Sequence, residues 1–422
     1  MAHKIWKILI VLYLFLLPWQ TRWIFNPRFL SGGYWEYGTA SFFATEIILW
    51  SAIMLFFYAN FRRRPWRHIF GGVHYATHRR ELYFAGGAIV FLLISVLQSV
   101  NRAVSYDYIF RIIEGACLIT MLAAESDKKI FWYAFWGGAA GQGILAIVQF
   151  FSQDIGASKW LGLASQTPAT LGSFVVESGS ERWLRAYGSF GSPNILGAFL
   201  AVALVLGLIL YLESRPLQKI YLTLGQSLIL IGLILSFSRG AWAAAVVGII
   251  GVAVYYAKRG LGYRFMILKQ QIFYTLVVGT LAFILTPLFA VRFDTGYRLE
   301  ARSMTERVSQ NREAFAVFKK HPVFGVGPGV YTYYLSVVHP GLPSYSYQPV
   351  HNIYLLILVE WGLVGLIFWF GVFGYLAVLV HKKRPEFLPV ILAILLAGVF
   401  DHFLWSLPAG AALWWGVFAL FI

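Results

Sequence analysis

Three motifs place a chemically capable side chain where an apolar run begins or is interrupted. Arg239 separates two apolar runs, Arg185 precedes another, and His351 with Asn352 opens a fourth. Arginine presents a fork of N–H donors suited to phosphate, and a neutral imidazole can take a proton from a hydroxyl group. These residue types suit proton abstraction beside a phosphate. The structural alternatives are a helix-capping or interfacial role for His351, and a contact with Glu360 or a backbone carbonyl for Arg239.

The composition indicates which kind of molecule must position these side chains. Of the 422 residues, 59% are hydrophobic and only 12% are charged, whereas soluble domains are about one quarter charged. A bilayer must therefore solvate much of the chain. The single cysteine, Cys117, excludes an internal disulfide and a cysteine metal cluster.

We expect an all-α polytopic membrane protein with about twelve transmembrane helices. The first apolar run has no small-x-small cleavage site after it, so we expect a retained helix rather than a cleaved signal peptide. The expected spans lie near residues 5–19, 40–59, 82–100, 107–124, 130–151, 194–212, 220–236, 241–257, 272–290, 362–380, 387–404 and 410–422.

The expected spans divide the chain into helical regions separated by two long outer loops. The second loop is the longest polar stretch, and long loops inside compact proteins are usually functional. The expected regions are N-terminal helices over 1–151, a first outer loop over 152–193, central helices over 194–290, a large outer catalytic loop over 291–361 and C-terminal helices over 362–422.

Basic residues predict the orientation of the chain. With the N-terminus inside, 19 of the 34 Lys and Arg residues fall in short inner loops, as the positive-inside rule requires, and both termini are cytoplasmic. The 15 outer basic residues include 12 arginines. We interpret this excess of arginine as an anion site, the alternative being ordinary charges at helix ends. Because the +16 net charge lies in interhelical loops, it does not indicate nucleic-acid binding.

The large outer loop has internal order. The run from Ser303 to Glu306 has the spacing of a capping box, and a helix from there would carry Arg307 and end before Pro322. The glycines of the segment 325–329 then require a turn. We therefore predict a long helix within this loop.

The sequence predicts no metal or cofactor site. The five aspartates are scattered without an Asp-x-Asp pair, which disfavours magnesium-dependent use of nucleotide sugars, and no His/Cys cluster suits zinc. The pair Asp401–His402, near the outer end of an expected helix, could be structural or functional. An enzyme without a metal would have to stabilise a phosphate leaving group with arginine.

Together these motifs resemble the O-antigen ligase and O-antigen polymerase superfamily, whose members share a region called Wzy-C. The resemblance covers roughly residues 180–380, with matching order and spacing, whereas the first 150 residues match in topology only. The segments that carry it are Arg185–Asn194, Ser236–Trp242, Arg307–Gly329 and Pro349–Gly362. The family often has tryptophan where this chain has Asn311, which weakens the packing match there.

The resemblance implies a GT-C-like integral membrane glycosyltransferase of the bacterial plasma membrane. Such an enzyme moves a glycan from polyprenyl (undecaprenyl) diphosphate to an acceptor on the outer face, without a metal. Carried over by motif, Arg239 and Arg307 would bind the diphosphate and His351 would act as general base. Arg185, Asn352 and Glu360 complete the implied set of substrate-binding residues.

Three readings of the function remain open at this stage. A ligase, which attaches the glycan to a lipid A core sugar, is favoured because one outer loop dominates. A polymerase or a protein O-oligosaccharyltransferase would use the same site with another acceptor. A lipid-linked glycan transporter would instead require discontinuous helices in corresponding positions of two halves, a symmetry that the sequence does not show.

Overall fold

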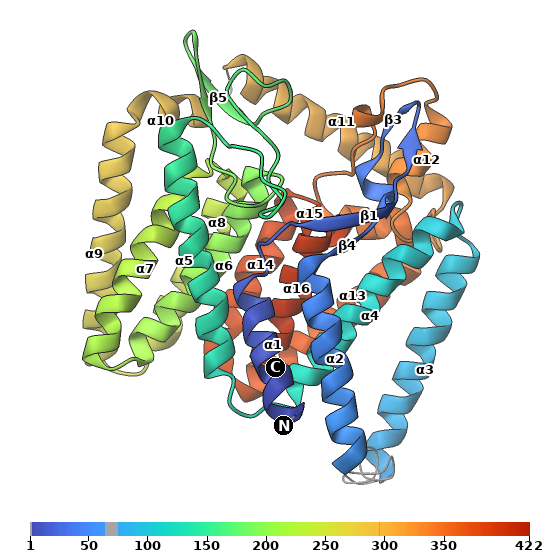
Figure 1. Cartoon of the computed structure of the whole chain (residues 1–422), viewed down its shortest axis with the longest axis horizontal. Coiled ribbons are helices and arrows are strands. Elements are labelled where there is room, and N and C mark those ends of the chain that lie inside the picture. Colours follow the sequence, from blue (N-terminus) through green and yellow to red (C-terminus); the bar gives the residue numbers. More distant parts are fainter. Residues whose placement is uncertain (1, 64–74, 295) are drawn as a thin grey trace.

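The structure is a computed structural model that describes residues 2–63, 75–294 and 296–422. Side chains are described for all of these residues except those within 61–85. Helices dominate these ranges, as the sequence predicts. The basic residues expected in the inner loop from Arg62 to Arg80 lie outside the described side chains. Figure 1 shows α5 to α9 on one side of the molecule, α2 to α4 on the other, and α14 and α16 between them.

The helices follow the order of the expected apolar runs. The N-terminal helices are α1 (Ala2–Phe15), α2 (Ala44–Arg63), α3 (Tyr75–Leu97), α4 (Arg102–Ala123) and α5 (Lys129–Ser152). The central helices are α6 (Pro193–Glu213), α7 (Pro216–Leu235), α8 (Arg239–Ala257) and α9 (Leu261–Ile284). The segment that follows holds α10 (Thr286–Phe293), α11 (Arg298–Lys320) and α12 (Tyr331–Val338). The C-terminal helices are α13 (Ile353–Lys383), α14 (Leu388–Phe400), α15 (Phe403–Ser406) and α16 (Pro408–Phe421).

Short antiparallel strand pairs, which the sequence analysis did not predict, lie in the connecting segments. Strand β1 (Arg22–Asn26) pairs with β4 (Ala40–Phe43), β2 (Phe29–Leu30) pairs with β3 (Gly33–Tyr34), and β5 (Val175–Ser178) pairs with β6 (Glu181–Leu184). The 3₁₀ turns are η1 (Glu36–Gly38), η2 (Ser344–Ser346) and η3 (Pro385–Phe387). The first expected outer loop is thus built around a β-hairpin, β5–β6.

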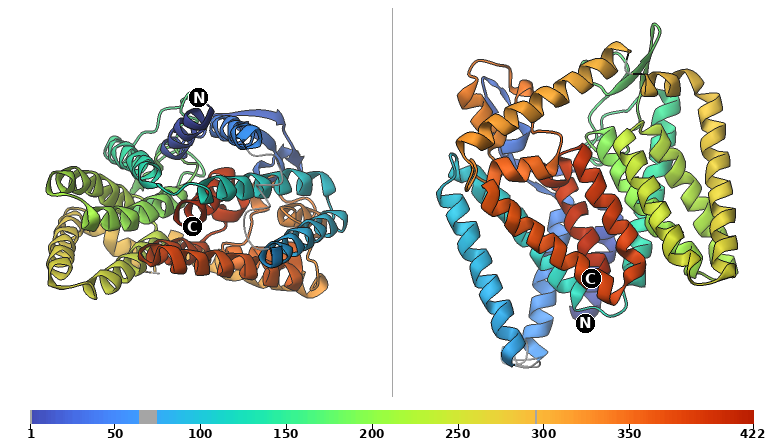
Figure 2. Two further views of the ribbon diagram at one scale, coloured as in Figure 1. Left: turned by 90° about the horizontal axis from the view of Figure 1, so that it is seen from below. Right: turned by 180° about the vertical axis from the view of Figure 1, so that it is seen from behind.

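The two ends of the molecule differ in what they carry. Both termini lie at one end in Figure 1, and α11 crosses the opposite end, as the view from behind in Figure 2 also shows. Contacts tie the terminal end together: Lys7 pairs with Glu125 at 2.5 Å, and Lys128 Nζ donates to the Ala419 carbonyl at 3.2 Å. The other end, which we call the α11 end, also holds β5–β6 and α12.

Helix α6 forms the centre of the bundle. It is buried along nearly its whole length, packing against α5, α7, α8 and α14. The sequence explains this position because α6 is apolar on every face, which suits a helix enclosed by others. Its start is fixed by Ser192, whose side chain accepts a hydrogen bond from the Asn194 N–H, and by Pro193 in the first turn. The start of α6 faces the α11 end.

The structure supports a polytopic helical membrane protein but does not confirm twelve crossings. Within the described residues, six helices are long and apolar enough to cross a membrane, namely α5, α6, α7, α8, α9 and α13. Shorter apolar helices cover Ala44–Asn60, Gly86–Leu97, Pro385–Phe400 and Pro408–Phe421. Helix α4 is missing from the long spans because Asp107, Arg111 and Glu114 interrupt its apolar sequence.

Several expected spans differ in their boundaries, and the run over 387–404 is divided between α14 and α15. The run over 272–290 is divided, because α9 ends at Ile284 and α10 begins with Pro287 in its first turn. Helix α13 begins nine residues before the expected span and is broken at Gly362, where φ is 67°. A Cβ atom at Gly362 would lie 2.2 Å from the Val323 carbonyl oxygen, so this close approach requires glycine.

The break in α13 anchors the glycine-rich segment 325–329. The Leu363 N–H donates to the Pro322 carbonyl at 2.9 Å, and the Gly327 N–H donates to the Glu360 carbonyl at 2.8 Å. The segment after α11 is therefore hydrogen-bonded to the break in α13. This arrangement fixes the position of α11 relative to the residues that begin α13.

Candidate active site

A large cavity lies at the α11 end. Its volume is about 1280 Å³, and α11 and the β5–β6 hairpin form one wall. The ends of α6, α8 and α14 that face α11 supply the remaining walls, including Ala198, Ala241 and Phe400. Polar side chains from both sides therefore line the cavity, and apolar side chains of α6, α8 and α14 lie beside them.

Arginines from distant parts of the sequence line this cavity. Four of the predicted site residues, Arg185, Arg239, Arg307 and His351, are brought together there. Four carboxylates also line it, belonging to Glu177, Glu300, Glu306 and Asp401. The full arginine set is Arg182, Arg185, Arg239, Arg292, Arg298, Arg302 and Arg307. The seven guanidinium groups exceed the four carboxylates, so the lining carries a net positive charge.

Arg307 has the fewest contacts among the predicted arginines. It lies within α11, which covers the predicted helix but begins at Arg298 rather than at the capping-box pattern of Ser303, and it is half-buried at the cavity wall. Across the described ranges, its guanidinium makes no hydrogen bond or ion pair. Its N–H donors are therefore free to bind an anion.

Arg239 begins α8 and is already in contact with other groups. The preceding Phe237 adopts φ 47°, which turns the chain sharply between α7 and α8. Arg239 Nη1 donates to the Arg292 carbonyl at 3.0 Å, and its Nη2 lies 2.9 Å from a carboxylate oxygen of Glu300. The side chain keeps 30% of its surface exposed. It can therefore contact a molecule in the cavity.

Arg185 is buried and supports its neighbours. Its Nε donates to the Ser236 carbonyl and its Nη2 to the Asn194 side-chain oxygen, both at 2.8 Å. Burial lowers the pKa of Arg185, and the nearby charge of Arg292 lowers it further. The arginine thus links the end of α7 to the start of α6, which places Asn194 for the contacts described next.

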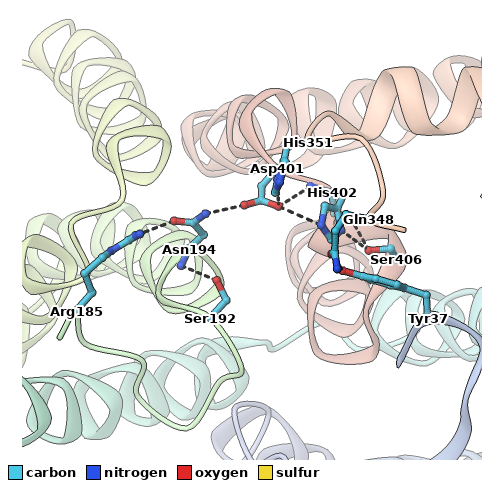
Figure 3. Close-up of polar contacts among 9 residues, drawn as sticks. All are labelled: Tyr37, Arg185, Ser192, Asn194, Gln348, His351, Asp401, His402 and Ser406. Carbon is cyan, nitrogen blue, oxygen red and sulfur yellow. Dashed lines mark hydrogen bonds and ion pairs between the residues drawn. The ribbon is translucent and has the colours of Figure 1, made fainter. Parts of the chain in front are cut away.

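His351 lies at the end of a chain of polar contacts (Figure 3). Its Nδ1 is 3.2 Å from Asp401 Oδ1, and Asp401 Oδ2 accepts a hydrogen bond from the Asn194 amide at 2.8 Å. Asn194 in turn accepts from Arg185. The four residues come from the segment after β6, the start of α6, the start of α13 and the end of α14.

The state of Asp401 follows from these contacts. Its oxygens lie beside the His351 Nδ1 and accept a hydrogen bond from the Asn194 amide, and both contacts stabilise a negative charge on the carboxylate. The His402 backbone N–H also donates to Asp401, at 2.8 Å. An ionised Asp401 favours the His351 tautomer that carries its proton on Nδ1, which leaves the Nε2 lone pair available to accept a proton.

His402 lies behind this pair. Its ring centroid is 5.1 Å from that of His351, and its Nδ1 is 2.7 Å from the Ser406 hydroxyl. The sequence analysis singled out Asp401 and His402 without deciding their role, and the structure places both beside His351.

A metal ion could be considered at this cluster. Ligand atoms of His351, Asp401 and His402 lie within 4.8 Å of one another. However, Asp401 already accepts hydrogen bonds from Asn194 and from the His402 N–H. The positive charge of the surrounding arginines also disfavours the binding of a metal cation there. These contacts describe a hydrogen-bonded support for His351 better than a set of open metal ligands.

Two predicted site residues lie away from the cavity lining and have structural contacts. The Asn352 side chain accepts hydrogen bonds from the Tyr354 and Leu355 N–H groups, so it caps α13. Glu360 is buried beside the glycine-rich segment, and its Oε1 accepts from the Tyr331 N–H at 3.4 Å. Both residues fix the start and the break of α13, and through them the position of His351.

Arg292 and Glu300 are cavity residues that the sequence analysis did not select. Arg292, in the last turn of α10, donates from Nε and Nη2 to the Phe237 carbonyl, at 3.1 and 2.7 Å, and contacts Glu300 through Nη1. The outer location of Arg292 was predicted, but not its contact with the α7–α8 turn. No sequence pattern singles out Glu300, because its pairing with Arg292 and Arg239 depends on how α10 and α11 fold back over α8.

Comparison with known proteins agrees with the motifs. Residues 224–370 match the family model described as O-Antigen ligase. The predicted resemblance to this superfamily is therefore confirmed over this segment of the chain. The segment contains Arg239, Arg307 and His351, whereas Arg185 and Asp401 lie outside it. No curated protein matches the chain.

Proposed function

We propose that this chain is a glycosyltransferase that moves a glycan from polyprenyl diphosphate to an acceptor hydroxyl, in the manner of an O-antigen ligase. The observation that supports it best is the shared cavity of Arg239, Arg307 and His351, which come from three separate segments. The cavity unites a group able to accept a proton with groups able to bind a diphosphate. The match to the O-antigen ligase family model supports the same class of enzyme.

The cavity suits the two parts of such a donor. Guanidinium groups of α8 and α11 would bind the diphosphate, and the alanine and phenylalanine side chains of α6, α8 and α14 would contact apolar parts of the lipid. The volume of about 1280 Å³ leaves room for sugar units as well. A donor that is anionic at one point and apolar beside it matches this distribution of side chains.

The reaction would be a single displacement at the anomeric carbon. The acceptor oxygen forms the new bond to this carbon, and the His351 Nε2 takes the hydroxyl proton. The bond from the sugar to the diphosphate oxygen breaks, and its electron pair leaves with the diphosphate. Arg307 and Arg239 would stabilise the negative charge that grows there, and such charge stabilisation is often the largest contribution to catalysis.

Asp401 would act as a positioning residue for the base. Its ionised carboxylate holds the His351 Nδ1 proton and directs Nε2 toward the acceptor. When His351 takes a second proton, the nearby negative charge stabilises the imidazolium. The chain through Asn194 to Arg185 would keep Asp401 in place. In this proposal the arginines supply the positive charge that other glycosyltransferases take from a metal ion.

The site would face the outside of a bacterial plasma membrane. Among the described residues, the basic segments predicted to be cytoplasmic lie at the end that also holds both termini, and the cavity lies at the α11 end. Both termini at one end require an even number of crossings. We propose the twelve spans of the sequence analysis, which the six long helices, the four shorter apolar helices, α1 and α4 would form. The acceptor would then be a lipid A core sugar presented at the outer leaflet.

A reconstitution experiment tests this function. Purified protein in nanodiscs receives a synthetic polyprenyl-diphosphate-linked glycan together with a lipid A core acceptor, and mass spectrometry follows the released lipid diphosphate and the product. We expect transfer to the core sugar and no transfer by the Arg307→Ala variant. Transfer only to a second lipid-linked glycan would indicate a polymerase, and transfer to a protein would indicate a protein glycosyltransferase. An intact donor with every acceptor would contradict the proposal.

A further inference from the structure

Glu300 makes an unusual pair of contacts inside the cavity. It lies in the first turn of α11 and is only 4% exposed. One of its carboxylate oxygens contacts the Arg292 Nη1, and the other lies 2.9 Å from the Arg239 Nη2. The buried carboxylate of Glu300 therefore contacts the guanidinium group of Arg239, which the proposed function assigns to the diphosphate.

We propose that Glu300 competes with the diphosphate for Arg239 and thereby promotes release of the polyprenyl diphosphate product. The inference rests on the proposed function, because it assumes that Arg239 binds the diphosphate. It assigns a role to a residue that lies between the two arginines and contributes no proton to the transfer. Glu300 is in this sense a positioning residue that sets how strongly the product is held.

The two contacts of Glu300 differ in strength. The contact with Arg292 is a hydrogen bond, and Arg292 is itself fixed by two hydrogen bonds to the Phe237 carbonyl. The contact with Arg239 lacks hydrogen-bond geometry, and among the described residues this second oxygen, Oε2, has no hydrogen-bond partner. A diphosphate can therefore replace the carboxylate at Arg239 while Arg292 keeps Glu300 close by.

The other carboxylates of the cavity are differently placed. Glu177 pairs with Arg298 at 2.9 Å, and Glu306 pairs with Arg302 at 2.7 Å along α11, in a pair whose side chains are 54% and 69% exposed. Neither contacts an arginine assigned to the diphosphate. Asp401 contacts His351. Within the described part of the chain, Glu300 is the buried acid that meets Arg239 directly.

The lipid diphosphate product carries more negative charge than the donor, which explains why competition at Arg239 would matter. In the donor, each phosphate carries one ionisable oxygen, because the lipid and the sugar occupy the ends of the diphosphate. When the sugar leaves, the diphosphate keeps the bridging oxygen with its electron pair and gains one negative charge. A cationic cavity therefore binds the product more strongly than the donor. A carboxylate beside Arg239 opposes the additional charge and favours release.

The test measures the affinity for inorganic diphosphate, which reproduces the charged part of the product. Isothermal titration calorimetry on the purified full chain would compare wild type with Glu300→Gln, which removes the charge but keeps an oxygen for Arg292. We expect the Kd of the variant to be roughly 3- to 10-fold lower. Glu300→Ala should change the Kd in the same direction, which guards against a folding defect peculiar to one substitution.

A matched control separates Glu300 from charge in general. Glu306→Gln removes one negative charge from the same helix, at an exposed pair, and should leave the Kd within about twofold of wild type. In the transfer assay, Glu300→Gln should also lower the donor KM and strengthen inhibition by added polyprenyl diphosphate. An architectural role for Glu300 predicts the reverse, since Arg239 would lose its orientation and bind diphosphate more weakly.

The possible failures are distinguishable. If Glu300→Gln leaves the Kd unchanged or raises it while Arg307→Ala still weakens diphosphate binding, the inference about Glu300 is wrong and the proposed function stands. An equal decrease of the Kd in Glu306→Gln would also contradict it, because the effect would then be one of net charge. If wild type does not bind diphosphate, the proposed function itself fails.

Discussion

Nδ1 of His351 lies 3.2 Å from Oδ1 of Asp401, although 50 residues separate the two in the chain. The pair joins the start of α13 to the end of α14, and Asp401 follows directly after the last residue of α14. Asn194 fixes the second carboxylate oxygen from a third element, at 2.8 Å. The contact at Nδ1 therefore fixes the orientation of the ring, and among the described residues Nε2 has no hydrogen-bond partner.

Asp401→Asn should reduce turnover by roughly 10²-fold or more while leaving donor binding intact. An amide at this position can donate to Nδ1 of His351, which would move the ring proton to Nε2 and remove the base. Turnover and KM in the reconstituted assay would show this as a loss in kcat alone. The control is Asp107→Asn, which alters an ion pair with Arg28 away from the cavity. Equal effects of the two variants would contradict the role of Asp401.

Arg307→Ala should abolish most transfer, by roughly 10²- to 10³-fold in kcat/KM, because the leaving diphosphate would lose a free guanidinium. Arg239→Ala should have the same direction of effect. Lysine at 307 should restore part of the activity, since it keeps the charge but loses the fork. Arg312→Ala provides the control, because Arg312 lies on the same helix outside the cavity lining. Wild-type rates in both alanine variants would place the diphosphate elsewhere.

The helical class and the grouping of Arg185, Arg239, Arg307 and His351 could be predicted from the sequence for a physical reason. Apolar runs indicate burial in lipid or in the helical bundle, and arginines at the ends of these runs indicate a polar surface. The outer helix was predicted from a capping-box pattern at Ser303, yet α11 begins at Arg298 and its N-cap, Tyr297, makes no side-chain hydrogen bond. The pattern thus indicated the helix but not its start. The motifs shared with the O-antigen ligase family supplied the roles, which the spacing of residues alone did not.

Other features depend on contacts between distant segments. Arg292 and Glu300 interact because α10 and α11 fold over α8, and nothing near Glu300 in the sequence indicates a buried carboxylate. Asn352 was expected at the substrate, yet its position before a helix also matches an N-cap, which is how the structure uses it. The β5–β6 hairpin was missed because its strands are only four residues long.

The topology can be tested by cysteine labelling in a Cys117→Ser background, because Cys117 is the single native cysteine. Cysteines at Ser309 and Ser344, at the α11 end, should react with an impermeant thiol reagent in intact cells. A cysteine beside Lys383, at the opposite end, should be shielded until the cells are permeabilised. The same is expected beside Arg64, which lies outside the described residues. The reverse pattern would place the cavity in the cytoplasm and overturn the proposed donor.

His351→Ala should lose roughly 10²- to 10⁴-fold in turnover and still bind inorganic diphosphate with nearly wild-type affinity, because the arginines remain. The reason is that His351 contacts Asp401 and the cavity but none of the arginines assigned to the diphosphate. Turnover and diphosphate affinity would be measured on the same preparation, with and without EDTA. Neither quantity should change with the chelator, because arginine rather than a cation would hold the diphosphate. If the alanine variant kept near-normal turnover, His351 would not be the base, and a loss of wild-type activity in EDTA would instead favour a metal at His351, Asp401 and His402.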